Sequence, residues 1–148
     1  MHDKMLMPER KLSKKFEFYG RHLLLDFRGC RVDLDDIELV KRDMLSAVTE
    51  VGATVLNCVW RKFEPHGVSL VVLLAESHAS VHTYPEERAC FIDLFTCGRR
   101  IRVEPFAEIM ARYWQPESVA SELRERCDVD APATVTGARP GPGLAAGR

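Results

Sequence analysis

The chain has 148 residues, of which 46% are hydrophobic and 29% are charged, a composition typical of a globular domain with a hydrophobic core. Its net charge of −1 gives no overall field that would attract nucleic acid or an anionic membrane. No apolar run approaches the roughly 20 residues that span a bilayer. The sequence has no N-terminal signal segment, and its five cysteines lack CxxC spacing, which disfavours a zinc site and a disulfide framework. We therefore expect a cytoplasmic protein without a metal ion.

The first half of the chain is predicted to start with a polar leader over residues 1–19. An apolar run over 21–27, stopped by Gly29, predicts a strand. Residues 33–51 have apolar side chains at helical spacing, aspartates near the start and Gly52 just past the end. This pattern predicts an amphipathic helix, because carboxylates cap the first N–H groups and glycine ends helices.

Four strands are predicted next, over 54–63, 68–75, 78–84 and 90–96. The second of them is almost wholly apolar, which indicates a buried central strand. Pro105 in the first turn and an apolar stripe predict a second helix over 104–114, and 117–127 fits either a helix or a final strand. From 128 to 148 the chain is rich in Ala, Pro and Gly, which predicts a disordered tail.

This order of elements predicts an α/β fold of the α+β type, formed by residues 20–127. It would be a two-layer sandwich in which a mostly antiparallel sheet carries helices on one face, because short turns join the consecutive strands. The other face would need its own cover. A second copy of the chain would supply it, so we expect a homodimer.

The stretch from Leu74 to Gly98 carries more polar side chains than a core strand needs, since a buried polar atom without a partner costs about 1–3 kcal/mol. Ser77 follows an apolar strand and precedes His78 and His82, which suggests nucleophile chemistry. Ordinary strand hydroxyls and a buried histidine explain the same residue types. No G-x-S-x-G elbow is present, so an α/β-hydrolase is not indicated. The i, i+4 histidines would suit a metal on a helix but not on a strand.

The run A-E-S-H-A-S-V-H-T-Y-P-E at 75–86, followed by D-L-F-T-C-G at 93–98, resembles the prokaryotic S-adenosylmethionine decarboxylase proenzymes. These proteins cut their own chain to make a pyruvoyl group. The resemblance continues upstream through G-R-H-L-L-L-D-F-R-G-C at 20–30, G-A-T-V-L at 52–56 and K-F-E-P-H-G-V-S at 62–69. It implies decarboxylation of S-adenosylmethionine, which gives the aminopropyl donor for spermidine synthesis.

The resemblance also implies a role for each polar residue of the stretch. Ser77 attacks the carbonyl of Glu76, and the chain is cut between 76 and 77. Ser69 hydrogen-bonds the intermediate, and His82 removes the α-proton of residue 77, so that elimination and hydrolysis leave a pyruvoyl group and release ammonia. That group serves as an electron sink for the substrate. Cys97 then returns a proton to the substrate, as a thiol that is largely protonated at neutral pH can do; its structural alternative is a small buried hydrophobe.

Substrate binding is implied for three further residues. Phe63 and Tyr84 would stack on the adenine, and Glu86 would accept hydrogen bonds from the ribose hydroxyls. The structural alternatives are two core aromatics and a turn carboxylate.

Two departures from the family pattern keep other functions open. Residues 87–91 read E-R-A-C-F where relatives often have Tyr-Gly-Tyr-Ala-Ala, and Leu70 stands where many have Gly. The same pyruvoyl chemistry on arginine or ornithine is therefore an alternative. A non-catalytic homologue acting as a binding or regulatory subunit is a second one, disfavoured because Ser69, Ser77, His82 and Cys97 are all present.

Strict alternation along the strand would put Ser77 and His82 on opposite faces of the sheet. For His82 to reach residue 77, the chain must bend or bulge between them. A strained peptide at Glu76–Ser77 would suit self-cleavage.

Overall fold

The computed structural model describes residues 19–97 and 100–127. The predicted leader, apart from Tyr19, and the predicted tail over 128–148 lie outside the described residues. The described elements are, in chain order, β1 (Tyr19–Arg28), α1 (Ile37–Glu50), β2 (Val55–Lys62), β3 (Val68–Leu74), β4 (Ser77–Tyr84), the short 3₁₀ helix η1 (Pro85–Glu87), β5 (Ala89–Cys97), α2 (Glu104–Trp114) and β6 (Ser118–Cys127).

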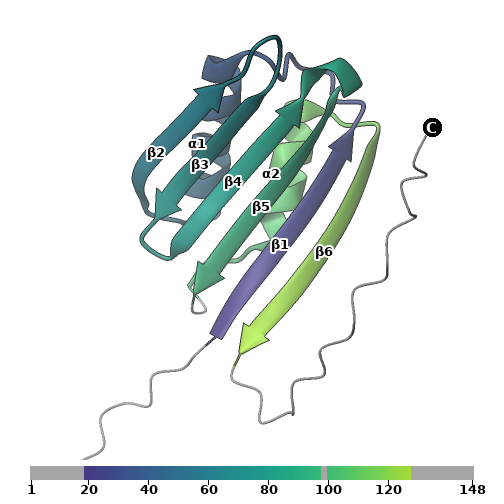
Figure 1. Ribbon diagram of the computed structural model, residues 1–148. Helices are drawn as coiled ribbons and strands as arrows, with labels where there is room; N and C mark the ends of the chain where they lie inside the picture. The colour runs from purple at the N-terminus through teal and green to yellow at the C-terminus, as the bar shows by residue number, and fades with distance from the viewer. Residues whose placement is uncertain (1–18, 98–99, 128–148) are drawn as a thin grey trace, which may run out of the picture.

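The strands form one six-stranded sheet in the order β2-β3-β4-β5-β1-β6, and every neighbouring pair is antiparallel. The two helices lie side by side on one face (Figure 1). The predicted two-layer α+β sandwich is confirmed. In the segment 117–127, left open between helix and strand, Ser118–Cys127 form the edge strand β6.

The core lies between the helices and the sheet. The inner strands β1, β3, β4 and β5 contribute alternate side chains to it, as the pleat requires. In β3, Val68, Leu70, Val72 and Leu74 are buried. The strand predicted to be buried and central lies inside the sheet, and in the single chain it is buried on this face alone. Val71 and Leu73 point the other way and are 42% and 50% exposed, because no helix covers that face.

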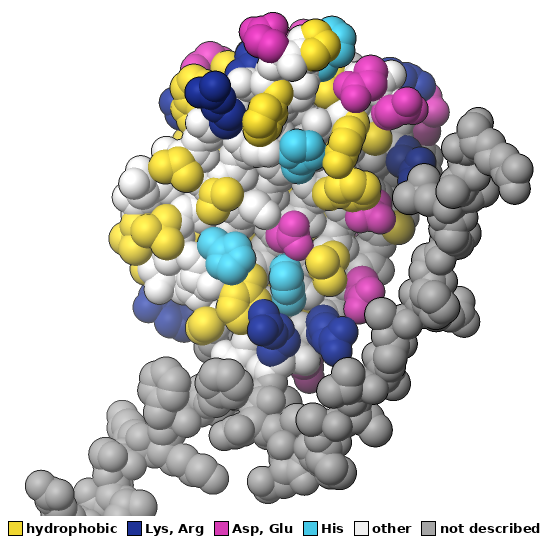
Figure 2. Space-filling model, in the orientation of Figure 1, with side chains coloured by type: hydrophobic (Ala, Val, Ile, Leu, Met, Phe, Trp, Pro, Cys, Tyr) yellow, Lys and Arg dark blue, Asp and Glu magenta, His cyan; other side chains and the backbone are white. Residues whose placement is uncertain are grey.

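The uncovered face of the sheet is largely hydrophobic. Its large exposed side chains include Val59, Val71, Leu73, Tyr84 and Phe91. Figure 2 looks onto this face and shows hydrophobic side chains interspersed with histidines and carboxylates. A patch of this kind on a monomer commonly marks an interaction or ligand site.

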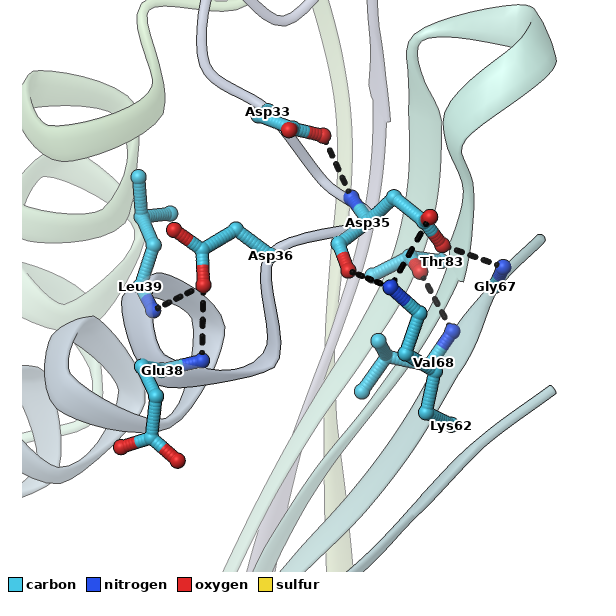
Figure 3. A network of polar contacts seen from close by, with 9 residues as sticks. All are labelled: Asp33, Asp35, Asp36, Glu38, Leu39, Lys62, Gly67, Val68 and Thr83. Atoms are coloured by element: carbon cyan, nitrogen blue, oxygen red, sulfur yellow. Dashed lines mark hydrogen bonds and ion pairs between the residues drawn. The ribbon is translucent and has the colours of Figure 1, made fainter.

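The aspartates before α1 fix the turn that joins β2 to β3 (Figure 3). Asp36 is the N-cap, and its carboxylate accepts hydrogen bonds from the amides of Glu38 (2.9 Å) and Leu39 (3.2 Å). The helix therefore begins four residues later than predicted. Asp35 is used elsewhere: its carboxylate accepts the Gly67 amide at 2.8 Å and pairs with Lys62 at 3.1 Å.

Candidate active site

Ser69 and His82 form a pair on the uncovered face. They are directly opposite in the register of β3 and β4, and Ser69 Oγ lies 2.5 Å from His82 Nδ1. When Nδ1–H donates to the serine hydroxyl, Nε2 keeps its lone pair and can accept a proton. Antiparallel pairing thus joins two residues that are 13 apart in sequence into one hydrogen-bonded unit.

Aromatic rings surround the imidazole of His82. The ring centroid of Phe63 is 6.1 Å from it, and Tyr84 meets it edge-on at 4.8 Å. Phe63 is 41% exposed and Tyr84 is 36% exposed, so neither is a core aromatic in the single chain. Glu86 follows two residues after Tyr84, in η1, and is exposed. This end of β4 therefore offers exposed ring faces beside a carboxylate.

A cavity of about 390 Å³ opens next to these rings. Tyr84 and Phe91 line it, as does Glu87. Its carboxylates are those of Asp26 and Glu87, and Glu86 is not among its lining residues. Glu87 is a position at which the chain departs from the family pattern.

Glu76 and Ser77 lie at the other end of β4. The carbonyl oxygen of Glu76 accepts a 2.8 Å hydrogen bond from the Cys97 amide. Ser77 has φ = +156°, a conformation that L residues rarely adopt and that is populated mainly by glycine. Its hydroxyl oxygen lies 3.1 Å from His78 Nδ1. The expected strain at the Glu76–Ser77 junction thus has a counterpart in the backbone of Ser77.

The Glu76 side chain is also held in place. Its carboxylate accepts the Thr54 amide at 3.0 Å. Desolvation raises the pKa of Glu76, but hydrogen bonds, led by that from the Thr54 backbone, outweigh it and leave this pKa below its usual value. Both the carbonyl and the carboxylate of Glu76 are thereby fixed ahead of Ser77.

Cys97 lies at the same end as Ser77. Its side chain is exposed at the end of β5, so the alternative of a small buried hydrophobe does not describe it. Ser77 faces Thr96, the residue before it, across β4 and β5. Cys97 is therefore a near neighbour of Ser77 through sheet pairing, although 20 residues separate them in sequence.

The structure does not bring His82 to Ser77 within one chain. Five residues of β4 separate them, a distance of about 16 Å along an extended strand. The β3–β4 register runs from Ser69–His82 to Leu74–Ser77 without a shift, so no bulge of the kind that would let His82 reach residue 77 is present in β4. The predicted residues thus fall into two groups at opposite ends of β4.

A third polar group, which we did not identify from the sequence, lies between these ends. Asp93 of β5 accepts from the Ser80 hydroxyl at 3.3 Å, and its other carboxylate oxygen lies 3.0 Å from His22 Nε2. The period-two spacing of His78, Ser80 and His82 was the available signal, since it places all three on one face. Pairing with His22 could not be read from the sequence because β1 is far away in the chain.

The described residues contain no group of three or more His, Cys, Asp or Glu side chains arranged to hold a metal ion. None of their helices has the length and apolarity needed to cross a membrane.

Comparison with known proteins gives one consistent result. The family model for S-adenosylmethionine decarboxylase matches residues 21–126. The S-adenosylmethionine decarboxylase proenzyme of Pelotomaculum thermopropionicum is 48% identical over 83 residues, which are 55% of this chain and 66% of that protein. The Brevibacillus brevis proenzyme of the same name is 36% identical over 104 residues, 70% of this chain and 78% of its own length.

A solved structure agrees with the sequence matches. The crystal structure of the adenosylmethionine decarboxylase from Aquifex aeolicus superimposes with a TM-score of 0.70 at 30% identity, covering 79% of this chain and 98% of that one.

Proposed function

The chain belongs to the S-adenosylmethionine decarboxylase family, and we propose that it is a self-cleaving, pyruvoyl-dependent decarboxylase of S-adenosylmethionine that supplies the aminopropyl donor for spermidine synthesis. The observation that carries this proposal is the junction between Glu76 and Ser77. The carbonyl that a serine would attack is already polarised by the Cys97 amide, and the attacking residue has an unusual backbone conformation. An ordinary strand end does not need the second feature.

In the first step, Ser77 Oγ bonds to the carbonyl carbon of Glu76 and loses its proton to a base. The bond to the nitrogen of residue 77 breaks and that nitrogen takes a proton, so an amide becomes an ester with no change of oxidation state. Removal of the α-proton of residue 77 then expels the Glu76 carboxylate. Hydrolysis of the resulting enamine consumes one water and releases ammonia, leaving the pyruvoyl group at the start of 77–148.

The residues around position 77 suit such a group. It supplies a carbonyl electron sink for decarboxylation. Cys97, exposed beside it, can return a proton to the substrate carbon. Phe63 and Tyr84 offer ring faces for a purine, and Glu86 a carboxylate for hydroxyl groups.

The separation of the two groups along β4 supports a homodimer. His82 and Ser69 cannot act on residue 77 of their own chain across about 16 Å. Suppose that a second copy packs on the hydrophobic uncovered face and that a two-fold axis relates the two copies. One end of β4 in the first copy then lies over the opposite end of β4 in the second. Ser69 and His82 of one copy then approach Ser77 and Cys97 of the other, so each site is built from both chains.

Intact mass under denaturing and reducing conditions tests the cleavage. The wild-type protein should give two chains, 1–76 and 77–148, and Ser77→Ala should remain whole. Ser80→Ala is the matched control, because Ser80 is a partly buried hydroxyl of the same strand and should still allow cutting. A wild-type protein that stays uncut after prolonged incubation would contradict the proposal.

Release of ¹⁴CO₂ from carboxyl-labelled compounds tests the substrate. S-adenosylmethionine should be turned over, and arginine and ornithine should not. Turnover of a basic amino acid alone would assign the same chemistry to a different substrate.

A further inference from the structure

The hydroxyl of Thr96 is unusual among the described residues. Thr96 is 0% exposed, and its Oγ1 has no hydrogen-bond partner in the described part of the chain. Buried polar groups in folded proteins nearly always have a partner, so an exception calls for a physical reason.

The sheet itself does not force such an arrangement. Thr83, on the neighbouring strand β4, is also buried, at 1% exposed. Its hydroxyl accepts a 2.8 Å hydrogen bond from the Val68 amide (Figure 3). A buried threonine in this sheet can therefore be satisfied, and the one that is not lies at the proposed cleavage site.

The register of β4 and β5 places Thr96 directly opposite Ser77. The bond from the Cys97 amide to the Glu76 carbonyl flanks this pair, which makes it a non-hydrogen-bonded pair. Opposed residues of that kind have Cα atoms about 4.5 Å apart, the closer of the two antiparallel spacings. The unpaired hydroxyl thus belongs to Thr96, and the amide that holds the Glu76 carbonyl belongs to the next residue, Cys97.

We propose that Thr96 is a further catalytic residue for self-cleavage, whose hydroxyl donates a hydrogen bond to the Glu76 carbonyl oxygen as negative charge develops there. The inference rests on the proposed function. When Ser77 Oγ bonds to the carbonyl carbon, the π electron pair moves onto the oxygen, and it returns when the bond to nitrogen breaks. The Cys97 amide satisfies the uncharged carbonyl, and a second donor becomes useful only once the oxygen is an anion.

Rates of cleavage in Thr96→Val and Thr96→Ser test this role. Valine keeps the shape and removes the hydroxyl, so we expect cleavage to slow by about 10²-fold, the effect typical of losing one oxyanion donor. Serine keeps the hydroxyl and should cut within a few-fold of the wild-type rate. The wild-type chain, run in parallel, reports on the proposed function separately.

Thermal unfolding distinguishes catalysis from structural support. Measured in a Ser77→Ala background, where every chain stays whole, adding Thr96→Val should leave the Tm unchanged or raise it, because an unpaired buried hydroxyl is removed. Thr83→Val is the matched control. It should lower the Tm, since the Val68 amide loses its acceptor, while cleavage stays near the wild-type rate.

Two outcomes would overturn the assignment of Thr96 while the wild type still cuts itself. One is cleavage of Thr96→Val at the wild-type rate. The other is slow cleavage together with a lowered Tm in the uncut background, because the hydroxyl would then support the fold rather than the reaction. If the wild-type chain is never cut, the result would instead contradict the proposed function, on which the inference depends.

Discussion

Ser69 Oγ and His82 Nδ1 lie 2.5 Å apart across β3 and β4, at the end of β4 opposite to Ser77. The residue expected to remove the α-proton is therefore oriented by a hydrogen bond but is distant from its proton in the same chain.

Two inactive variants are expected to complement each other. Ser77→Ala cannot be cut, and His82→Ala should stop before elimination. If His82 acts across a dimer, mixed dimers combine Ser77 of one chain with His82 of the other, and part of the His82→Ala chain should be cut. Co-expression with different mass tags and intact-mass analysis checks this. If mixed dimers form but the His82→Ala chain in them stays uncut, a site shared between the two chains would be contradicted.

Cys97→Ala should separate self-cleavage from decarboxylation. The backbone amide that holds the Glu76 carbonyl remains in this variant, so the chain should still be cut. Loss of the thiol should lower the rate of ¹⁴CO₂ release, or the rate at which the protonated, decarboxylated product forms. The expected decrease is about 10²–10⁴-fold, the range for a general acid. Cys58→Ala, on the edge strand β2, is the control. Equal activities of the two variants would remove the role given to Cys97.

The adjacent carboxylates of η1 should differ in their effects on substrate binding. Glu86→Gln should raise the KM for S-adenosylmethionine by about tenfold or more, because a charged acceptor for the ribose hydroxyls is lost. Glu87→Gln should change this KM little. Steady-state kinetics of both variants check the assignment. The reverse order would place the substrate in the cavity that Glu87 lines.

Asp35→Asn should weaken the fold in a pH-dependent way. The Gly67 amide, together with Lys62, holds the pKa of the Asp35 carboxyl below its ordinary value, so this carboxylate stabilises the fold at pH values above about 3.9. The stabilisation is lost as the pH falls through the lower, folded-state pKa. The Tm difference from the parent, in a Ser77→Ala background, should therefore be largest near neutral pH and shrink below pH ~4. A pH-independent difference would show that charge is not involved.

Asp43→Ala should destabilise the contact between the two helices. The Asp43 carboxylate accepts a 2.9 Å hydrogen bond from the Trp114 indole, and both side chains are buried. An unpaired buried donor costs about 1–3 kcal/mol, which chemical denaturation of the uncut variant would measure. Asp43→Asn keeps an acceptor and should recover part of the loss. Equal stability of the two variants would mean that the indole finds another partner.

The sequence determined the local features of this protein. Periodicity placed α2 at 104–114, as observed, and apolar runs with turn residues located the central strands, because both signals depend on neighbouring residues alone. The motif at 75–86, with the runs at 62–69 and 93–98, indicated the family and the site residues predicted from the sequence. The start of α1 was predicted too early, since two of its three aspartates bond to the turn around Gly67 and to a neighbouring amide.

Only the tertiary structure decided which of these residues are neighbours. Sheet pairing put His82 beside Ser69, joined Asp93 to His22, and set Thr96 against Ser77. It also showed a regular β3–β4 register, without the bulge that would let His82 reach residue 77, so that His82 and Ser77 stay apart in one chain. These contacts join segments 13 to 71 residues apart, and strand register, which fixes them, is set by the packing of the whole sheet rather than by any local run of residues.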